Sequence, residues 1–98
     1  MYIPSQIKLF NQTIKVVYSR TLMDKQGAFA LWEYNKNKIT LQQSTRKNPL
    51  TKEQIESSLV HEITHSFLDL MGHSKLSEDE VFVSSLSNLI HQFIVQIH

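Results

Sequence analysis

The chain has 98 residues, of which 41% are hydrophobic and 19% charged, with a formal net charge of +1 at pH 7. This length predicts one domain, residues 1–98, with a single modest core. A charge so near zero gives no general attraction to nucleic acid or acidic membranes. The absence of cysteine excludes disulfides and thiolate zinc sites. Neither a signal peptide nor a membrane-spanning stretch is visible, so we expect a soluble, cytoplasmic protein.

The first half of the chain predicts β-strands. Ile7 and Leu9 alternate with polar residues, a tight turn is favoured at residues 11–12, and the alternation resumes over residues 14–18. This pattern predicts a hairpin. Residues 20–27 contain turn-forming residues, and we expect a loop there.

A second hairpin is predicted further along. Residues 28–34 are rich in aromatic side chains and residues 39–42 alternate, with a polar turn at residues 35–38 between them. Helical patterns occupy the rest of the chain. The expected fold class is therefore α+β: a small, mostly antiparallel sheet followed by two packed helices.

The first helix is expected to begin after Pro49 and to end near Gly72. Thr51 lies three residues before Gln54, which is a capping-box pattern. Apolar residues then recur at helical spacing and predict one buried face: Ile55, Leu59, Ile63, Phe67 and Leu70.

This helix contains the motif His-Glu-x-x-His at residues 61–65. Residues four apart lie on the same face of a helix, so His61 and His65 can reach one metal ion. Imidazole suits zinc, and the carboxylate of Glu62 can take a proton from water activated by the metal. The alternative is that both histidines are solvated helix residues and Glu62 is an ordinary surface carboxylate.

A second helix is expected to start near Ser77. Its apolar residues recur at helical spacing, and we expect them to form core against the first helix and the sheet: Phe82, Leu86, Leu89, Ile90, Phe93, Ile94 and Ile97. Because a short loop joins the two helices, a residue early in the second helix could reach the metal.

A zinc ion bound by two histidines needs a third protein ligand. Leu68 and Met71 stand where the metzincin motif requires glycine and a third histidine, so that arrangement is excluded. Glu80 also completes a capping-box pattern with Ser77, in which it would bond to the backbone instead of a metal. Four candidates remain open: His73, Glu78, Asp79 and Glu80.

The His-Glu-x-x-His motif, a short loop and then Glu80-Val81-Phe82-Val83-Ser84-Ser85-Leu86 resemble the gluzincin metallopeptidases, most closely the ImmA/IrrE family. In that family the second helix opens with Glu-Ala-Asn-x-Phe-Ala-Ala, and its glutamate is the third zinc ligand. Glu80 matches this glutamate and residues 84–85 are small, whereas Val81 and Phe82 depart from the Ala-Asn pair. The resemblance covers about residues 27–90, including the two strands before the first helix.

The resemblance implies a minimal zincin-like metallopeptidase domain with zinc on His61, His65 and Glu80, and with Glu62 as the general base. It implies a peptide or protein substrate that adds as a strand to an exposed sheet edge. Family members act on repressors, which suggests narrow or regulatory cleavage. Four residues could stabilise an oxyanion, and the sequence does not choose among them: Tyr18, Tyr34, His73 and His91.

Two other functions remain open. One is a zinc-dependent endoribonuclease resembling the ribosomal-RNA maturation family, although Glu62 replaces its motif glycine and His73 is out of register. Basic residues that could contact phosphates are Lys36, Lys38, Arg46, Lys47 and Lys52. The other is a non-catalytic binding module that keeps the same fold. We expect no nucleic-acid or membrane partner.

Overall fold

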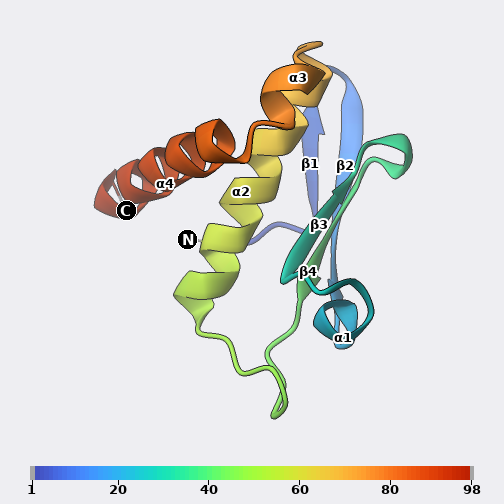
Figure 1. Cartoon of the computed structure of the whole chain (residues 1–98), viewed down its shortest axis with the longest axis vertical. Coiled ribbons are helices and arrows are strands. Elements are labelled where there is room, and N and C mark those ends of the chain that lie inside the picture. Colours follow the sequence, from blue (N-terminus) through green and yellow to red (C-terminus); the bar gives the residue numbers. More distant parts are fainter. Residues whose placement is uncertain (1, 98) are drawn as a thin grey trace.

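Four strands form one sheet, and a long helix packs against it (Figure 1). The computed structural model describes residues 2–97. The elements in chain order are β1 (Gln6–Leu9), β2 (Gln12–Ser19), α1 (Leu22–Gln26), β3 (Ala30–Glu33), a 3-10 turn (Tyr34–Lys36), β4 (Lys38–Gln42), α2 (Lys52–Leu70), α3 (Ser74–Ser77) and α4 (Glu80–Ile97). The expected α+β class is confirmed.

The sheet is mixed, with strand order β1-β2-β4-β3. Both predicted hairpins are present, because β1 pairs antiparallel with β2 and β3 pairs antiparallel with β4. The central pair, β2 and β4, is parallel, which the prediction of a mostly antiparallel sheet did not include. Alternation shows which face of a strand is buried, but it carries no information on the neighbouring strand or its direction.

The path of the chain between the hairpins explains the parallel pair. The segment expected to be a loop at residues 20–27 contains the short helix α1, whose Leu22 is buried. This connection carries the chain outward to β3 at the sheet edge, and β4 then returns between β3 and β2. The arrangement leaves β3 with a neighbour on only one side.

The core lies between the central strands and α2. It consists of buried side chains from β2, β4 and α2: Ile14, Val16, Ile39, Leu41 and Leu59. Most of the predicted apolar face of α2 packs there, but Phe67 is exposed. The predicted capping box is confirmed, since the Thr51 hydroxyl accepts from the Gln54 N–H at 3.1 Å and Gln54 Oε1 accepts from the Thr51 N–H at 2.8 Å. The α2 helix therefore begins at a fixed residue and holds its histidines in a defined register.

Gln42, at the end of β4, is fully buried and holds the α1 connection to the sheet. Its Nε2 donates to the carbonyls of Arg20 and Gln43, each at 2.9 Å, and its Oε1 accepts from the Met23 N–H at 2.8 Å. Replacing it with leucine removes three part-buried hydrogen bonds to the backbone, and each such loss is costly.

We therefore expect Gln42→Leu to lower the free energy of unfolding by about 2–4 kcal/mol. Urea denaturation followed by circular dichroism measures the change. The exposed neighbour Gln43 offers a matched control, because Gln43→Leu should change stability by no more than about 0.5 kcal/mol. Equal stability of the two variants would contradict the assigned role.

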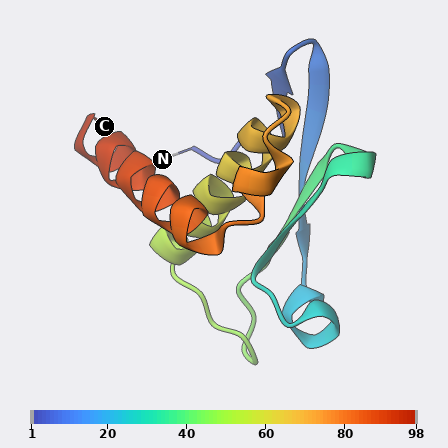
Figure 2. The same cartoon turned by 45° about the horizontal axis from the view of Figure 1, so that its top comes forward.

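The last helix, α4, packs on α2 and α3 and projects away from the sheet, with α2 between them (Figures 1 and 2). The prediction that its apolar residues form core against the sheet is wrong. Its buried residues are Val83, Ser87 and His91, whereas Leu89, Phe93 and Ile97 are more than half exposed. Helical periodicity identifies an apolar face but not what covers it. Within residues 2–97, no helix has the combined length and hydropathy of a membrane span.

Candidate metal centre

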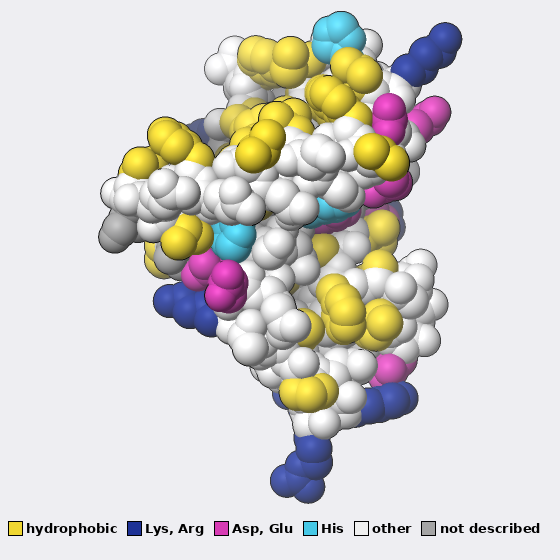
Figure 3. Space-filling model, turned by 60° about the vertical axis from the view of Figure 1, so that its left-hand side comes forward, with side chains coloured by type: hydrophobic (Ala, Val, Ile, Leu, Met, Phe, Trp, Pro, Cys, Tyr) yellow, Lys and Arg dark blue, Asp and Glu magenta, His cyan; other side chains and the backbone are white. Residues whose placement is uncertain are grey.

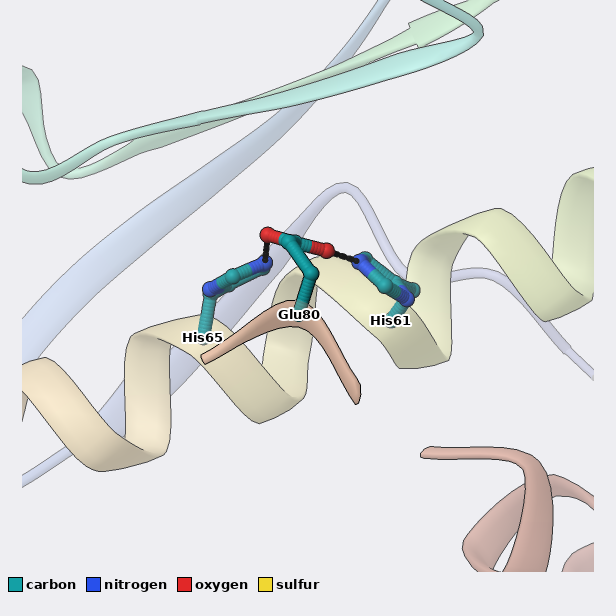
Figure 4. A group of neighbouring side chains, drawn as sticks. All are labelled: His61, His65 and Glu80. Atoms are coloured by element: carbon teal, nitrogen blue, oxygen red, sulfur yellow. Dashed lines mark ion pairs between the residues drawn. The ribbon is translucent and has the colours of Figure 1, made fainter. Parts of the chain in front are cut away.

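His61 and His65 lie one turn apart on α2 and face the start of α4 (Figure 4). Their ring centroids are 5.0 Å apart, and both side chains are partly exposed. The helix continues without interruption through the motif, from Lys52 to Leu70. The helical register that the motif requires is therefore present.

Glu80 brings its carboxylate to both histidines. Its Oε2 lies 3.3 Å from His61 Nε2 and its Oε1 lies 3.1 Å from His65 Nε2 (Figure 4). The alternative of a capping box at the start of this helix is wrong. Asp79 takes the cap position, because its Oδ1 accepts from the Phe82 N–H at 3.1 Å, and Ser77 instead ends α3. The Glu80 side chain, 64% exposed, is free to meet the histidines.

The three side chains form a donor set suited to zinc. One ligand atom from each of His61, His65 and Glu80 lies within 4.8 Å of the other two. Two imidazole nitrogens and a carboxylate oxygen match a catalytic zinc site, in which the fourth position is left for water or substrate. The other candidates are placed differently: His73 and Glu78 are exposed and flank α3, and Asp79 caps α4.

Each histidine contacts a buried serine through its other ring nitrogen. Ser77 Oγ lies 2.9 Å from His65 Nδ1, and Ser87 Oγ lies 3.4 Å from His61 Nδ1. The Ser87 hydroxyl donates to the Ser84 carbonyl at 3.2 Å, and the Ser77 hydroxyl donates to the His65 carbonyl at 3.5 Å. A hydroxyl that donates to a carbonyl can accept from Nδ1–H, and in that tautomer the Nε2 atom is the one available to a metal ion. Such partners orient metal-binding histidines.

Neither serine was predicted from the sequence. Ser87 follows Glu80 by seven residues, about two helical turns, so both lie on the same side of α4. That spacing could have identified Ser87 as a neighbour of the metal-binding residues. Ser77 gave no comparable signal, because its contact with His65 depends on how the short helix α3 turns the chain.

Glu62 lies beside the two histidines and is nearly buried. Its Oε1 accepts from the backbone N–H of Trp32 on β3 at 3.0 Å, and its Oε2 lies 4.0 Å from His61 Nε2. Burial raises the pKa of the Glu62 carboxyl above its ordinary value, and nearby Glu80 raises it further, while His61 and the Trp32 N–H oppose this rise. A carboxylate with a raised pKa is a better proton acceptor than an ordinary surface carboxylate.

The site opens to the outside through a hollow of about 300 Å³ between the start of β3 and the first half of α2. Its lining residues are Phe29, Ala30, Ser57, Ser58, His61 and Glu62. A larger hollow of about 500 Å³ is lined by Tyr2, Ile3, Tyr18, Lys52 and Ile55, none of which belongs to the metal-binding group. The smaller hollow is the one that adjoins the candidate metal centre.

The residues considered for other roles are placed elsewhere. His91 is buried between α4 and α2, with its Nε2 3.9 Å from Glu56 Oε1. Lys36 and Lys38 lie 3.3 and 3.7 Å from the carboxylate of Glu33. Lys47 pairs with Asp24 at 3.1 Å, which holds the pKa of that carboxyl below its ordinary value. Several of the basic residues considered for phosphate binding thus already have acidic partners.

No family model, curated protein or solved structure matches this chain. The interpretation of the site therefore rests on its own residues: two histidines and a glutamate that converge on one point, with the largely buried carboxylate of Glu62 beside them.

Proposed function

We propose that the protein is a zinc-dependent metallopeptidase of the zincin type, most similar to the ImmA/IrrE gluzincins. The observation that carries this proposal is the position of Glu80, whose two carboxylate oxygens each meet the Nε2 atom of a motif histidine. With Glu62 next to them, the residues fit the donor set and the base that such an enzyme needs.

A bound zinc ion supplies Lewis-acid chemistry, which acidifies water and polarises a peptide carbonyl. The residues of the chain supply the rest. His61, His65 and Glu80 would hold the ion, and the two serines would orient the histidine rings. Glu62 takes a proton from the attacking water and gives it to the amine nitrogen that leaves when the C–N bond breaks.

The exposed edge of β3 supports a peptide as the substrate. Since β3 has β4 on one side only, its other side presents backbone groups that an extended peptide can bind. The Trp32 N–H is one of these groups, and it already contacts Glu62. A peptide strand added there would lie beside Glu62 and over the hollow. The small size of that hollow favours narrow, regulatory cleavage over general digestion.

Metal analysis tests the proposal most directly. Elemental mass spectrometry of the purified wild type should find about one zinc ion per chain, and His61→Ala and Glu80→Ala should lose it. His73→Ala is the matched control and should keep it. A peptide-library screen on the zinc-loaded wild type should then find cleavage. No zinc binding in excess metal, or loss of zinc in His73→Ala instead of Glu80→Ala, would overturn the assignment.

Ser77→Ala is expected to weaken zinc binding by about 10- to 100-fold, because His65 loses the partner that orients its ring. Competition with a coloured chelator measures the dissociation constant. Ser85, which is exposed on the same helix as Glu80, provides the control: Ser85→Ala should bind zinc like the wild type. An unchanged constant in Ser77→Ala would show that the hydroxyl does not position His65.

A further inference from the structure

Trp32 on β3 is attached to α2 at two points. Its backbone N–H donates to Glu62 Oε1 at 3.0 Å, and its indole Nε1–H donates to Asp69 Oδ2 at 2.8 Å. Asp69 follows Glu62 by seven residues, so both lie on the same side of α2, roughly 10 Å apart along its axis. A single hydrogen bond would let the strand turn about it, whereas two bonds to separated residues fix how β3 lies along the helix.

The strand needs such an attachment because it is short and lies at the edge of the sheet. It has four residues and pairs with β4 at the end of the strand order. The elements on which β3 mainly packs are β4 and α2. The helix α4 packs on the other side of α2, and Figure 3, which brings α4 forward, shows hydrophobic side chains exposed along it. The position of β3 beside the site therefore depends on its contacts with α2.

The location of Asp69 is unfavourable for the helix that contains it. Asp69 lies in the last turn of α2, where the free carbonyl groups carry partial negative charge, and this turn has no basic residue. A residue that breaks a local rule in this way points to a tertiary or functional role. The contact that Asp69 makes is the one with the Trp32 indole, between two half-buried side chains and at a length typical of a charge-assisted hydrogen bond.

The Trp32 N–H in turn lies at the metal centre. It occupies Oε1 of Glu62, whose Oε2 lies 4.0 Å from His61 Nε2. The direction of the carboxylate therefore depends on where β3 places this N–H. When an extended peptide binds the N–H instead, the same placement sets where the peptide lies relative to Glu62 and the metal-binding group.

We propose that Asp69 is a positioning residue of this site. By holding the Trp32 indole it fixes the backbone of β3, and it thereby fixes the Trp32 N–H relative to Glu62. Asp69 lies outside the metal-binding group and acts through Trp32. The structural part of this role is independent of any reaction, whereas its effect on hydrolysis rests on the proposed function.

Nuclear magnetic resonance of the metal-free chain tests the structural part, because Trp32 is the single tryptophan. In a proton–nitrogen correlation spectrum, Asp69→Ala should move the indole signal of Trp32. It should also move the backbone N–H signal of Trp32 in the same direction as Glu62→Ala, which removes the acceptor outright. Asp69→Asn keeps an acceptor oxygen and should leave the backbone signal near its wild-type position. A backbone signal that stays in place in Asp69→Ala would overturn the positioning role.

Kinetics of the zinc-loaded protein test the effect on hydrolysis. Asp69→Ala should lower kcat/KM by about 10- to 100-fold with unchanged zinc content, because a misplacement of roughly 1 Å can cost this much. Trp32→Phe removes the indole N–H but keeps the backbone N–H, and it should give the same loss. Since both changes break one bond, the double variant should lose no more than either single variant.

The controls separate this inference from the proposed function. Asp69→Asn should retain most of the activity, and Asp24→Ala, at an exposed aspartate on α1, should match the wild type. Full activity in Asp69→Ala, or additive losses in the double variant, would overturn the effect on hydrolysis. A wild type without hydrolysis would instead overturn the proposed function, and the spectra of the metal-free chain would still decide the role of Asp69.

Discussion

Glu62→Gln is expected to lower the rate of peptide hydrolysis by about 100- to 10,000-fold, the usual contribution of a general acid–base group. Glutamine keeps the shape of the side chain and its Oε1 can still accept from the Trp32 N–H. It cannot take up the proton of the attacking water. The zinc content should stay at the wild-type value, because Glu62 is not one of the three grouped ligands.

The measurement is kcat/KM on a peptide identified in the cleavage screen, beside zinc per chain. Glu53→Gln provides the control, because Glu53 is an exposed glutamate in the first turn of α2, and it should retain full activity. Wild-type activity in Glu62→Gln would show that another group serves as the base.

The same variant carries an expected effect on stability. Burial raises the pKa of Glu62 in the folded protein, so the folded state binds this proton more tightly than the unfolded state does. Protonated Glu62 therefore contributes to the free energy of unfolding at low pH. This contribution is lost as the pH rises through the folded-state pKa. At neutral pH, metal-free Glu62→Gln should therefore have a higher Tm than the metal-free wild type.

Zinc is expected to raise the Tm of the wild type by a large amount. A ligand present at roughly 1,000 times its Kd stabilises the folded state by about 4 kcal/mol. For a domain of this size that corresponds to a shift on the order of 15–30 °C. The physical reason is that the ion would join the start of α4 to the middle of α2.

Thermal unfolding with zinc and with a chelator measures this shift. His65→Ala and Glu80→Ala should lose most of it, because each removes one member of the donor set. His73→Ala should keep it, because His73 lies outside that set. An equal shift in His65→Ala and in the wild type would place the stabilising ion at a different site.

The features that the sequence predicted correctly are local ones. The start of α2 follows from the Thr51–Gln54 capping box, and the pairing of His61 with His65 on one face follows from helical spacing. Both hairpins follow from alternation, although the turn of the first lies at residues 10–11 and not at 11–12. Each of these depends on interactions between residues close in the chain, which composition and spacing describe well.

The features that the sequence did not decide depend on distant contacts. The choice between Glu80 as ligand and as cap required knowing that Asp79 caps α4 and that α3 separates Ser77 from it. The parallel pairing of β2 with β4 required the path of the chain through α1. The exposure of α4 was missed because a pattern of apolar residues does not identify the surface that covers them.

The hydrogen bond from the Trp32 N–H to Glu62 links the basicity of Glu62 to the binding of substrate. Under the proposed function, a peptide docking along β3 would compete with Glu62 for the same N–H donor. Since that donor lowers the pKa of Glu62, its transfer to the peptide makes the carboxylate a stronger base. Substrate binding would thus raise the basicity of Glu62, and without substrate the Trp32 N–H would keep the pKa of Glu62 lower.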